Sequence, residues 1–347
     1  MKQPKCIHKL SAGVAVFLVF LLGVGYAMAE DPAAFYKGKT IVLTVGSSPG
    51  GGYDTWSRLL APALEKVTGA TVIVKNMPAG GGVVALHDIY HTKNSRGLKI
   101  HTARAILPPL LETVNFPGTS ARWKVEELQW IGRLSVDEPA FAVAANKFKT
   151  FDEVRADKEF LCGVDAAMSV SGTRTAIAFE ALGLSNGKIV AGYPGGSERR
   201  LAVIQGELDA TSGSYDSLYR YFAAGDLKPV WVMVQEKLKK APDVPIISEL
   251  GVTEKGKKWL DWELKIEQSG RTIVAPPDVP MDRIKFLRDA MAKAVADPTF
   301  LKKVARLKYS LQYMRGNELQ DLLQGVMKLS PEEKKELTYI LKDKYVK

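Results

Sequence analysis

The segment from residue 46 to residue 54 has the composition of an anion-binding loop. Its glycines permit a sharp turn and leave backbone N–H groups unobstructed. A β-rich run precedes it, and from Asp54 onward apolar residues recur at the spacing of one helix face. The loop is therefore expected at a helix N-terminus, where the positive end of the helix dipole favours an anion. It reads Gly46-Ser47-Ser48-Pro49-Gly50-Gly51-Gly52-Tyr53-Asp54.

Two further loops show the same pattern of small residues before a helix. Asn76–Gly82 reads N-M-P-A-G-G-G and follows the β-rich run Val72–Val74. Ala167–Thr173 reads A-M-S-V-S-G-T and follows the run Leu161–Val164. Each loop alone is also consistent with a tight turn and a helix cap. Three such loops together favour a shared site for one small anion.

Catalytic and nucleotide-binding interpretations of the first loop fit less well. Residues 46–50 satisfy G-x-S-x-G, but the residue after the serine must donate an N–H to the oxyanion hole, and Pro49 has none. A Walker loop needs a lysine where Tyr53 stands. The contiguous glycines 50–52 also match the spaced dinucleotide fingerprint poorly. We therefore predict no catalytic residue and no cofactor.

Three histidines lie close together in the sequence. His87 and His91 are four residues apart on an expected helix, and His101 lies on the next expected strand. No H-E-x-x-H motif and no acidic ligand cluster accompany them. We interpret His87 and His91 as surface residues and predict no metal site.

The elements that position these loops alternate along the chain. The alternation of strands and helices predicts an α/β fold with mainly parallel sheets and helices on both faces. The C-terminal part is mostly helical, and a proline-rich connection over residues 275–280 is expected to mark a return between domains. The expected strands are 41–45, 72–74, 98–101, 141–145, 161–164, 189–191, 208–211 and 230–234, and the expected helices are 54–67, 83–91, 174–182, 198–206 and 216–224.

The first 29 residues have the three-part pattern of a cleavable signal peptide. Three lysines precede an apolar stretch from Leu10 to about Gly25, and the small residues Ala27 and Ala29 mark a cleavage site. The alternative is an uncleaved membrane anchor, for which the apolar stretch is rather short. We therefore expect a periplasmic protein whose mature chain begins at Glu30.

Cysteine content and charge limit the possible partners. The mature chain would keep only Cys162, within an apolar run, so we expect no disulfide and a buried, inert thiol. The formal net charge is +10, and loss of the three signal-peptide lysines leaves +7. Basic and acidic residues are interspersed, without the arginine–aromatic stripe of a nucleic-acid-binding surface. The charge therefore predicts no nucleic-acid partner and a mild preference for anions.

Motifs of one known family occur in order over almost all of the mature chain. Ser48–Asp54 and Asn76–Gly82 match P-P-G-G-G-T-D and N-R-P-G-A-G-G. On these motifs and four shorter ones, the sequence resembles the substrate-binding proteins of tripartite tricarboxylate transporters, also called Bug or TctC-like receptors. The shorter matches are Ala191–Gly196 to V-P-Y-K-G-G, Ile204–Asp209 to L-x-G-x-V-D, Ala224–Lys228 to x-A-G-x-L-(K/R) and Pro242–Ile246 to P-D-V-P-T.

The resemblance implies a type II periplasmic binding protein fold, in which two α/β domains enclose a ligand cleft. We expect residues 30–137 together with 268–347 to form domain 1 and residues 138–267 to form domain 2. The implied function is capture of a small organic carboxylate, either a di- or tricarboxylate or an aromatic carboxylate. A monomeric receptor of this kind would deliver its ligand to the membrane permease subunits of a tripartite tricarboxylate transporter.

In this cleft the three loops would donate charge-assisted hydrogen bonds to the carboxylate. Tyr193 and Tyr215 are expected on the wall, and Asp209 is expected near the cleft in a mainly structural role. Arg174 and Arg271 are either counter-ions or structural residues. The predicted ligand-binding residues are Ser47, Ser48, Gly50, Gly51, Gly52, Tyr53, Ala79, Gly80, Gly81, Ser169, Ser171, Gly172, Thr173, Tyr193 and Asp209.

The sequence departs from the family motifs in three places. Tyr53 replaces a small residue, Met77 replaces an arginine, and the segment 259–271 differs from the shorter family pattern. Two other functions stay open at this point. A sensor would present the same ligand to a membrane signalling protein, and an enzyme would act on a carboxylate. The enzyme is disfavoured because no base, nucleophile or metal-binding set converges in the sequence.

Overall fold

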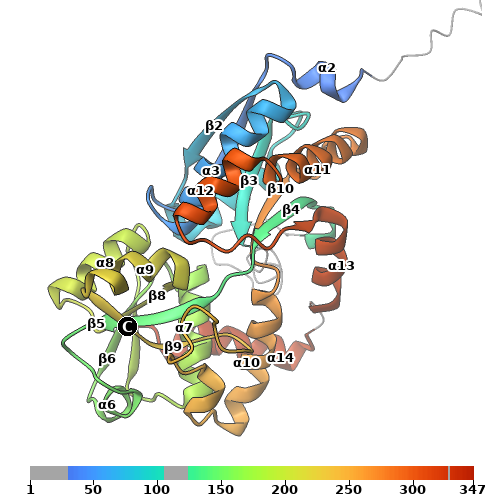
Figure 1. Cartoon of the computed structure of the whole chain (residues 1–347). Helices are drawn as coiled ribbons and strands as arrows, with labels where there is room; N and C mark the ends of the chain where they lie inside the picture. Colours follow the sequence, from blue (N-terminus) through green and yellow to red (C-terminus); the bar gives the residue numbers. More distant parts are fainter. Residues whose placement is uncertain (1–29, 105–123, 327–328) are drawn as a thin grey trace, which may run out of the picture.

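The computed structural model describes residues 30–104, 124–326 and 329–347. They form two α/β units, one above the other in Figure 1, and each unit is built around its own sheet. The signal-peptide prediction concerns residues 1–29 and lies outside the described residues. Within the described ranges, no helix has both the length and the apolar composition needed to cross a bilayer.

The first unit contains a six-stranded sheet with the order β11-β4-β10-β3-β1-β2. β1 is parallel to β2 and β3, whereas β10 is antiparallel to β3 and β4. The strands are β1 (Thr40–Val45), β2 (Thr71–Asn76), β3 (Lys99–Arg104), β4 (Gln129–Ser135), β10 (Arg271–Ala275) and β11 (Met314–Arg315). The helices are α2 (Pro32–Tyr36), α3 (Gly52–Thr68), α4 (Val83–His91), α11 (Met281–Val295), α12 (Pro298–Arg306) and α13 (Gly316–Val326), with short turns η1 (Ala79–Gly82) and η2 (Val125–Glu127).

The second unit contains a five-stranded sheet with the order β7-β6-β8-β5-β9. β6 is parallel to β7 and β8, whereas β5 is antiparallel to β8 and β9. The strands are β5 (Pro139–Ala144), β6 (Phe160–Gly163), β7 (Gly187–Val190), β8 (Ala210–Ser214) and β9 (Leu227–Val232). The helices are α6 (Phe151–Ala156), α7 (Val170–Leu182), α8 (Gly196–Gln205), α9 (Tyr215–Ala224) and α10 (Glu254–Glu267), with the short turn η3 (Ile247–Leu250).

Both sheets are mixed, although most strands of each sheet run in one direction: β10 and β11 are reversed in the first sheet, and β5 is reversed in the second. The chain crosses between the units through residues 136–138, from β4 to β5, and returns through residues 268–270, from α10 to β10. A strand that enters a sheet from the side of the other unit must run away from that side. β5 and β10 therefore run opposite to the neighbouring strands whose carboxyl ends face the other unit.

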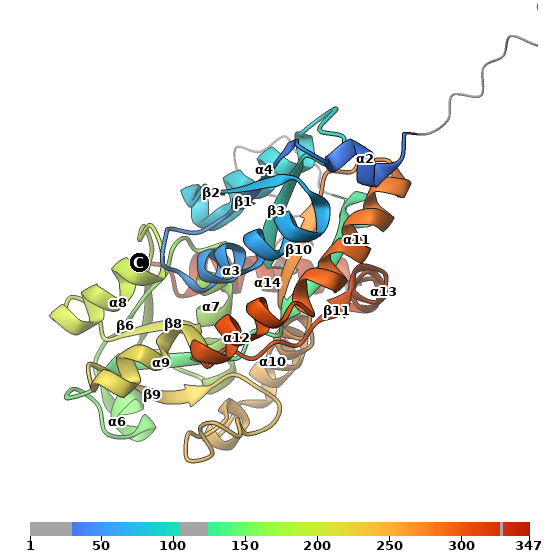
Figure 2. The same ribbon diagram turned by 45° about the horizontal axis from the view of Figure 1, so that its top comes forward.

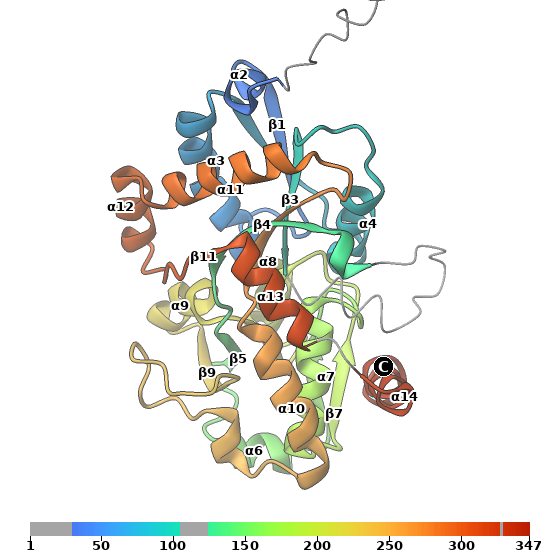
Figure 3. The same ribbon diagram turned by 90° about the vertical axis from the view of Figure 1, so that its right-hand side faces the viewer.

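A third connection is made by the C-terminal helices. α13 packs on β4 and contacts α10, and Figure 3 shows it lying beside α10. α14 (Pro331–Tyr339) and the π-helical turn η4 (Ile340–Lys344) then pack into the core of the second unit through Leu337, Ile340 and Leu341. Val346 bridges to Ile189 of β7. Residues 331–347 thus depart from the predicted assignment of 268–347 to domain 1, because their apolar face packs on the second core.

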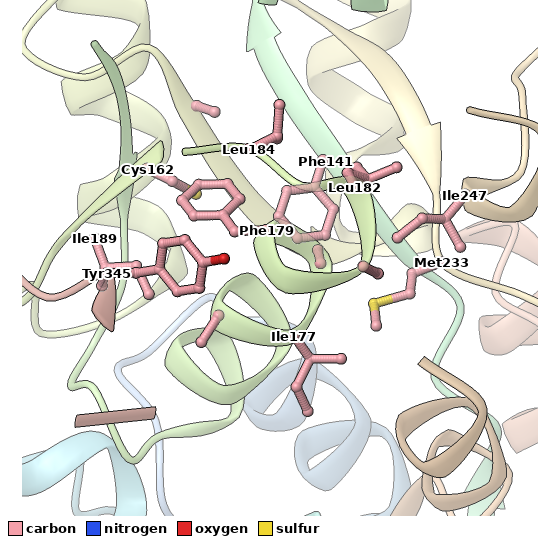
Figure 4. Close-up of a cluster of buried hydrophobic side chains, with 14 of the residues drawn as sticks. Phe141, Cys162, Ile177, Phe179, Leu182, Leu184, Ile189, Met233, Ile247 and Tyr345 are labelled. Carbon is pink, nitrogen blue, oxygen red and sulfur yellow. The ribbon is translucent and has the colours of Figure 1, made fainter. Parts of the chain in front are cut away.

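Each unit has its own apolar core. Trp56 of α3 is fully buried in the first core, and Phe179 of α7 in the second. Figure 4 shows Cys162 of β6 beside Phe179, with Tyr345 from the C-terminal segment next to Ile189. Burial raises the pKa of the Cys162 thiol to about 12, as expected for an inert core cysteine.

Candidate functional site

A cavity of about 90 Å³ lies where the two units meet. Loops at the carboxyl ends of strands in both sheets line it, together with Asp137 of the first crossover and Arg271 at the start of β10. The lining residues from the first unit and the crossovers are Gly46, Ser47, Gly51, Gly52, Tyr53, Gly81, Asp137 and Arg271. Those from the second unit are Asp165, Val170, Ser171, Arg174, Gly196, Arg199, Arg200, Ser212, Gly213, Ser214 and Ser217.

Four helices begin at this cavity. α3 comes from the first unit, and α7, α8 and α9 come from the second, below it in Figure 2. The cap or first turn of each helix contributes lining residues, for example Gly51, Ser171, Gly196 and Ser214. Helix N-termini carry N–H groups without intrahelical partners and the positive end of the helix dipole. Their convergence suits the cavity to an anion.

α3 begins two residues earlier than the sequence predicted. Its N-cap is Gly51, and Asp54 lies inside the first turn. The Asp54 carboxylate is buried and accepts hydrogen bonds from the Gly50 N–H and from Arg58 and Asn76. Burial alone would raise the pKa of Asp54, but these hydrogen bonds hold it below its usual value. Asp54 thereby fixes the loop from within.

The structure brings six of the predicted ligand-binding residues to the cavity wall: Ser47, Gly51, Gly52, Tyr53, Gly81 and Ser171. Ser47 is the clearest candidate for a ligand contact among these six, because its Oγ is buried and has no hydrogen-bond partner among the described residues. That hydroxyl is available to a ligand. The role of all six in binding stays a prediction.

The other predicted residues lie outside the cavity lining, in supporting positions. Ser169 caps α7 by accepting a hydrogen bond from the Gly172 N–H. Asp209 pairs with Lys147 and accepts a hydrogen bond from the Leu161 N–H. These polar groups are used within the protein. The residues outside the lining are Ser48, Gly50, Ala79, Gly80, Ser169, Gly172, Thr173, Tyr193 and Asp209.

The loops of the two units touch beside the cavity. Ser48 Oγ donates a hydrogen bond to Glu198 Oε2 of α8, at 3.2 Å. A Cβ atom on Gly195 would collide with Ser48 Oγ, and a Cβ atom on Gly81 would collide with Ser169. Glycine at positions 81 and 195 therefore permits the close approach of the two units.

Three buried charged residues form the floor of the cavity. Asp137, in the first crossover, accepts hydrogen bonds from Arg174 Nη2 at Oδ2 and from Arg271 Nη2 at Oδ1, each at 2.7 Å. Arg174 also donates to Glu267 Oε1 at 3.1 Å. Burial alone would lower the pKa of both arginines, but the neighbouring carboxylates raise it. Arg174 and Arg271, left open by the sequence, thus line the cavity and are also paired within the protein.

Two further arginines come from α8. Arg199 Nε lies 3.0 Å from Asp165 Oδ1, and Arg199 Nη1 donates to Ser212 O at 2.8 Å. The Arg200 guanidinium lies 4.9 Å from the centre of the Tyr221 ring and donates to Ser197 Oγ at 3.1 Å. Burial lowers the pKa of Arg200. The wall formed by α8 is therefore basic.

A wider groove of about 630 Å³ lies next to the first crossover. Val136 and Glu138 line it, whereas the intervening Asp137 lines the cavity. None of the three predicted loops contributes to this groove, and its Lys240 pairs with Glu138 and Asp216. The smaller cavity is therefore the better candidate site.

The histidines are not gathered into a metal site. His87 and His91 are exposed on α4, as predicted, with ring centres 4.4 Å apart. His101 is buried, with Nδ1 2.9 Å from Thr44 Oγ1, and burial lowers its pKa to about 4. Across residues 30–104, 124–326 and 329–347, no group of three or more His, Cys, Asp or Glu residues could hold a metal ion.

A family profile described as the tripartite tricarboxylate transporter family receptor, TctC, matches residues 57–338. The chain belongs to this family. The match confirms the resemblance drawn from the glycine-loop motifs. Because TctC proteins are receptors, membership gives the chain a solute-binding role.

Two relatives illustrate the distance between TctC sequences. The UPF0065 protein in the gbd 5' region of Cupriavidus necator is 24% identical over 312 residues, which cover 88% of this chain and 90% of the relative. Protein BugT from Bordetella pertussis is 25% identical over 247 residues, which cover 70% of this chain and 74% of the relative.

Three solved structures share the fold of this TctC chain. MatC from Rhodopseudomonas palustris, solved with bound malate, has a TM-score of 0.70 at 16% identity and covers 88% of this chain and 99% of its own. The periplasmic binding protein BugD has a TM-score of 0.71 at 17% identity and covers 90% of this chain and 100% of its own. An R. palustris protein solved with adipate has a TM-score of 0.70 at 15% identity and covers 87% of this chain and 97% of its own. These likenesses confirm the predicted periplasmic binding protein fold.

Several lining residues of this TctC chain were missed by the sequence analysis. Asp137 gave no signal, because its partners Arg174 and Arg271 lie 37 and 134 residues away in the sequence. Arg199 and Arg200 had a usable signal, since both follow the loop Tyr193–Gly196 in the first turn or two of an expected helix. A basic pair at such a position points toward an anion site.

Proposed function

We propose that this chain is a periplasmic receptor that captures a small organic carboxylate in the cavity between its two units. The observation that carries the proposal is the convergence of four helix N-termini, with arginine side chains, on one cavity. A carboxylate there would accept hydrogen bonds from backbone N–H groups and serine hydroxyls of both units. Contacts with both units would stabilise the closed form.

The rest of the proposal follows from the family and the fold. MatC was solved with malate and a second related structure with adipate, which supports a carboxylate ligand. Delivery to the membrane permease subunits of a tripartite tricarboxylate transporter follows from the family description. Export through a signal peptide at residues 1–29 would place the receptor with those subunits. The chain would bind its ligand without chemical change, as a receptor and not an enzyme.

A thermal-shift screen of residues 30–347 against organic acids tests this function. At least one carboxylate should stabilise the protein, by about 2.7 kcal/mol at 100 times its dissociation constant. The matched amides, which have a similar shape but no charge, should give no shift. Stabilisation by sugars or cations and not by any carboxylate would contradict the proposal.

Ser47→Ala should weaken binding of the acid found in the screen by about fivefold, roughly the 1 kcal/mol of one net hydrogen bond. The free energy of unfolding should stay within about 0.5 kcal/mol of the wild type, because Ser47 Oγ has no hydrogen-bond partner among the described residues. Calorimetric titration and urea unfolding measure the two quantities.

Ser330→Ala is the matched control for this substitution. Ser330 caps α14 by accepting a hydrogen bond from the Glu333 N–H and is not part of the cavity lining. Its loss should lower the free energy of unfolding by about 1 kcal/mol and leave affinity unchanged. Wild-type affinity in Ser47→Ala would exclude the Ser47 hydroxyl from the site.

A further inference from the structure

Asp137 places a carboxylate of the protein where two cavity-lining arginines would otherwise meet a ligand carboxylate. Its side chain is about 2% exposed, as are those of Arg174 and Arg271. Both Asp137 oxygens are engaged, one by each arginine. Asp137 lies in the short crossover between β4 and β5, so its backbone is held in place by a strand of each sheet.

The remaining hydrogen bonds of the two arginines are also directed into the protein. Arg271 Nη1 donates to Ser135 Oγ at 2.8 Å, and Arg174 Nε donates to Glu267 Oε1 at 3.1 Å. The two guanidinium groups are therefore paired with two carboxylates, Asp137 in the cavity lining and Glu267 outside it. Arg271 Nε has no hydrogen-bond partner in the described part of the chain. A ligand carboxylate that binds either Nη2 group would compete with Asp137.

Four arginines line the cavity, and one of them has no carboxylate partner in the described part of the chain. Arg199 is balanced by Asp165 at 3.0 Å. Arg200, by contrast, has no carboxylate within 4 Å in the described part of the chain; its guanidinium donates to Ser197 Oγ and lies over the Tyr221 ring. Glu198 is not part of the cavity lining and accepts a hydrogen bond from Ser48 at the contact between the units.

We infer that Asp137 acts as a built-in carboxylate and that this receptor selects monocarboxylates over dicarboxylates. This inference rests on the proposed function and narrows its ligand class. One ligand carboxylate would be matched by Arg200 and the surrounding N–H donors. A second carboxylate would be buried without a free cation, which carries a large desolvation cost. The small volume, about 90 Å³, also favours a short ligand.

Calorimetric titration of residues 30–347 with matched acids tests the inference. The pairs are butyrate and succinate, 2-hydroxybutyrate and malate, and hexanoate and adipate. Within a pair, a terminal methyl group becomes a carboxylate while the carbon count is unchanged. In each pair that binds, the monocarboxylate should bind at least tenfold more tightly. A tighter dicarboxylate would overturn the inference and leave the proposed function standing, whereas no binding by any carboxylate would defeat both.

Asp137→Asn should reverse the preference, so that the dicarboxylate of a pair binds at least tenfold more tightly than the monocarboxylate. The change removes the competing charge and keeps the size of the side chain. Asp289→Asn makes the same charge change at an exposed residue, 60% accessible and paired with Arg315, and should keep the wild-type preference. An Asp137→Asn protein that folds, by circular dichroism, and keeps the wild-type preference would overturn the inference.

Arg200→Gln tests the same inference if the Asp137→Asn protein does not fold. Loss of the lining arginine that has no carboxylate partner among the described residues should weaken monocarboxylate binding at least tenfold. Wild-type affinity in a folded Arg200→Gln protein would overturn the inference.

Discussion

Gly81→Ala is expected to weaken carboxylate binding at least 100-fold, or about 2.7 kcal/mol. A Cβ atom at residue 81 would collide with Ser169, which caps a helix of the opposite unit. The collision occurs only when the units approach as closely as they do in this structure. The substitution should therefore destabilise the closed form more than the open form. Calorimetric titration with the acid identified by the screen measures the loss.

Gly80→Ala separates this effect from local backbone strain. Gly80 and Gly81 have nearly the same backbone angle, with φ of +62° and +64°. An alanine at either position costs roughly 1–2 kcal/mol in the left-handed conformation. A Cβ atom at Gly80, however, would meet only Val83 and Val84 of its own segment, at 3.6 and 3.8 Å. Gly80→Ala should lower stability as much as Gly81→Ala but keep most of the affinity. Equal affinities would refute the closure argument.

Arg174→Met should lower the free energy of unfolding by about 3–5 kcal/mol, the cost of breaking a buried ion pair from one side. Arg174 is about 2% exposed and is shared by Asp137 and Glu267. Methionine keeps much of the side-chain volume. It removes one of the two arginines in this cluster, so the two buried carboxylates are left with Arg271 as the remaining cation. Urea unfolding at neutral pH, followed by circular dichroism, gives the change.

Arg315→Met removes an arginine from an exposed pair and serves as the control. Arg315 lies 2.6 Å from Asp289, and their side chains are 47% and 60% exposed. Solvent screens such a pair, so its loss should change the free energy of unfolding by no more than about 1 kcal/mol. If both variants lose the same small amount, the buried cluster does not stabilise the fold as we argue.

The sequence predicted those parts of the fold that depend on local patterns. Each of the eight expected strands overlaps a strand of the structure, and the helix over residues 83–91 has the expected bounds. β10 was missed because it opens with Arg271 and Thr272, two buried polar residues that break an apolar run. The position of α14 shows a different limit of local patterns. An amphipathic helix pattern does not indicate which of two cores the apolar face will pack against.

The candidate site could be predicted only where one segment supplies it. The loop from Gly46 to Tyr53 is a local feature: four of its residues besides Gly46 line the cavity, and Ser48 lies beside it. The floor of the site is different. Asp137, Arg174 and Arg271 come from a crossover, a helix and a strand, and only the assembled fold brings their charges together. No local spacing encodes such a cluster.

The burial of Cys162 makes opening and closing of the receptor measurable. A thiol that is 0% exposed, with a pKa near 12, should stay unmodified while introduced cysteines react with maleimide dyes. Val84 on α4 and Leu201 on α8 are 47% and 53% exposed and belong to opposite units. Donor and acceptor dyes at these two positions would report the separation of the units by resonance energy transfer, with the native cysteine left in place.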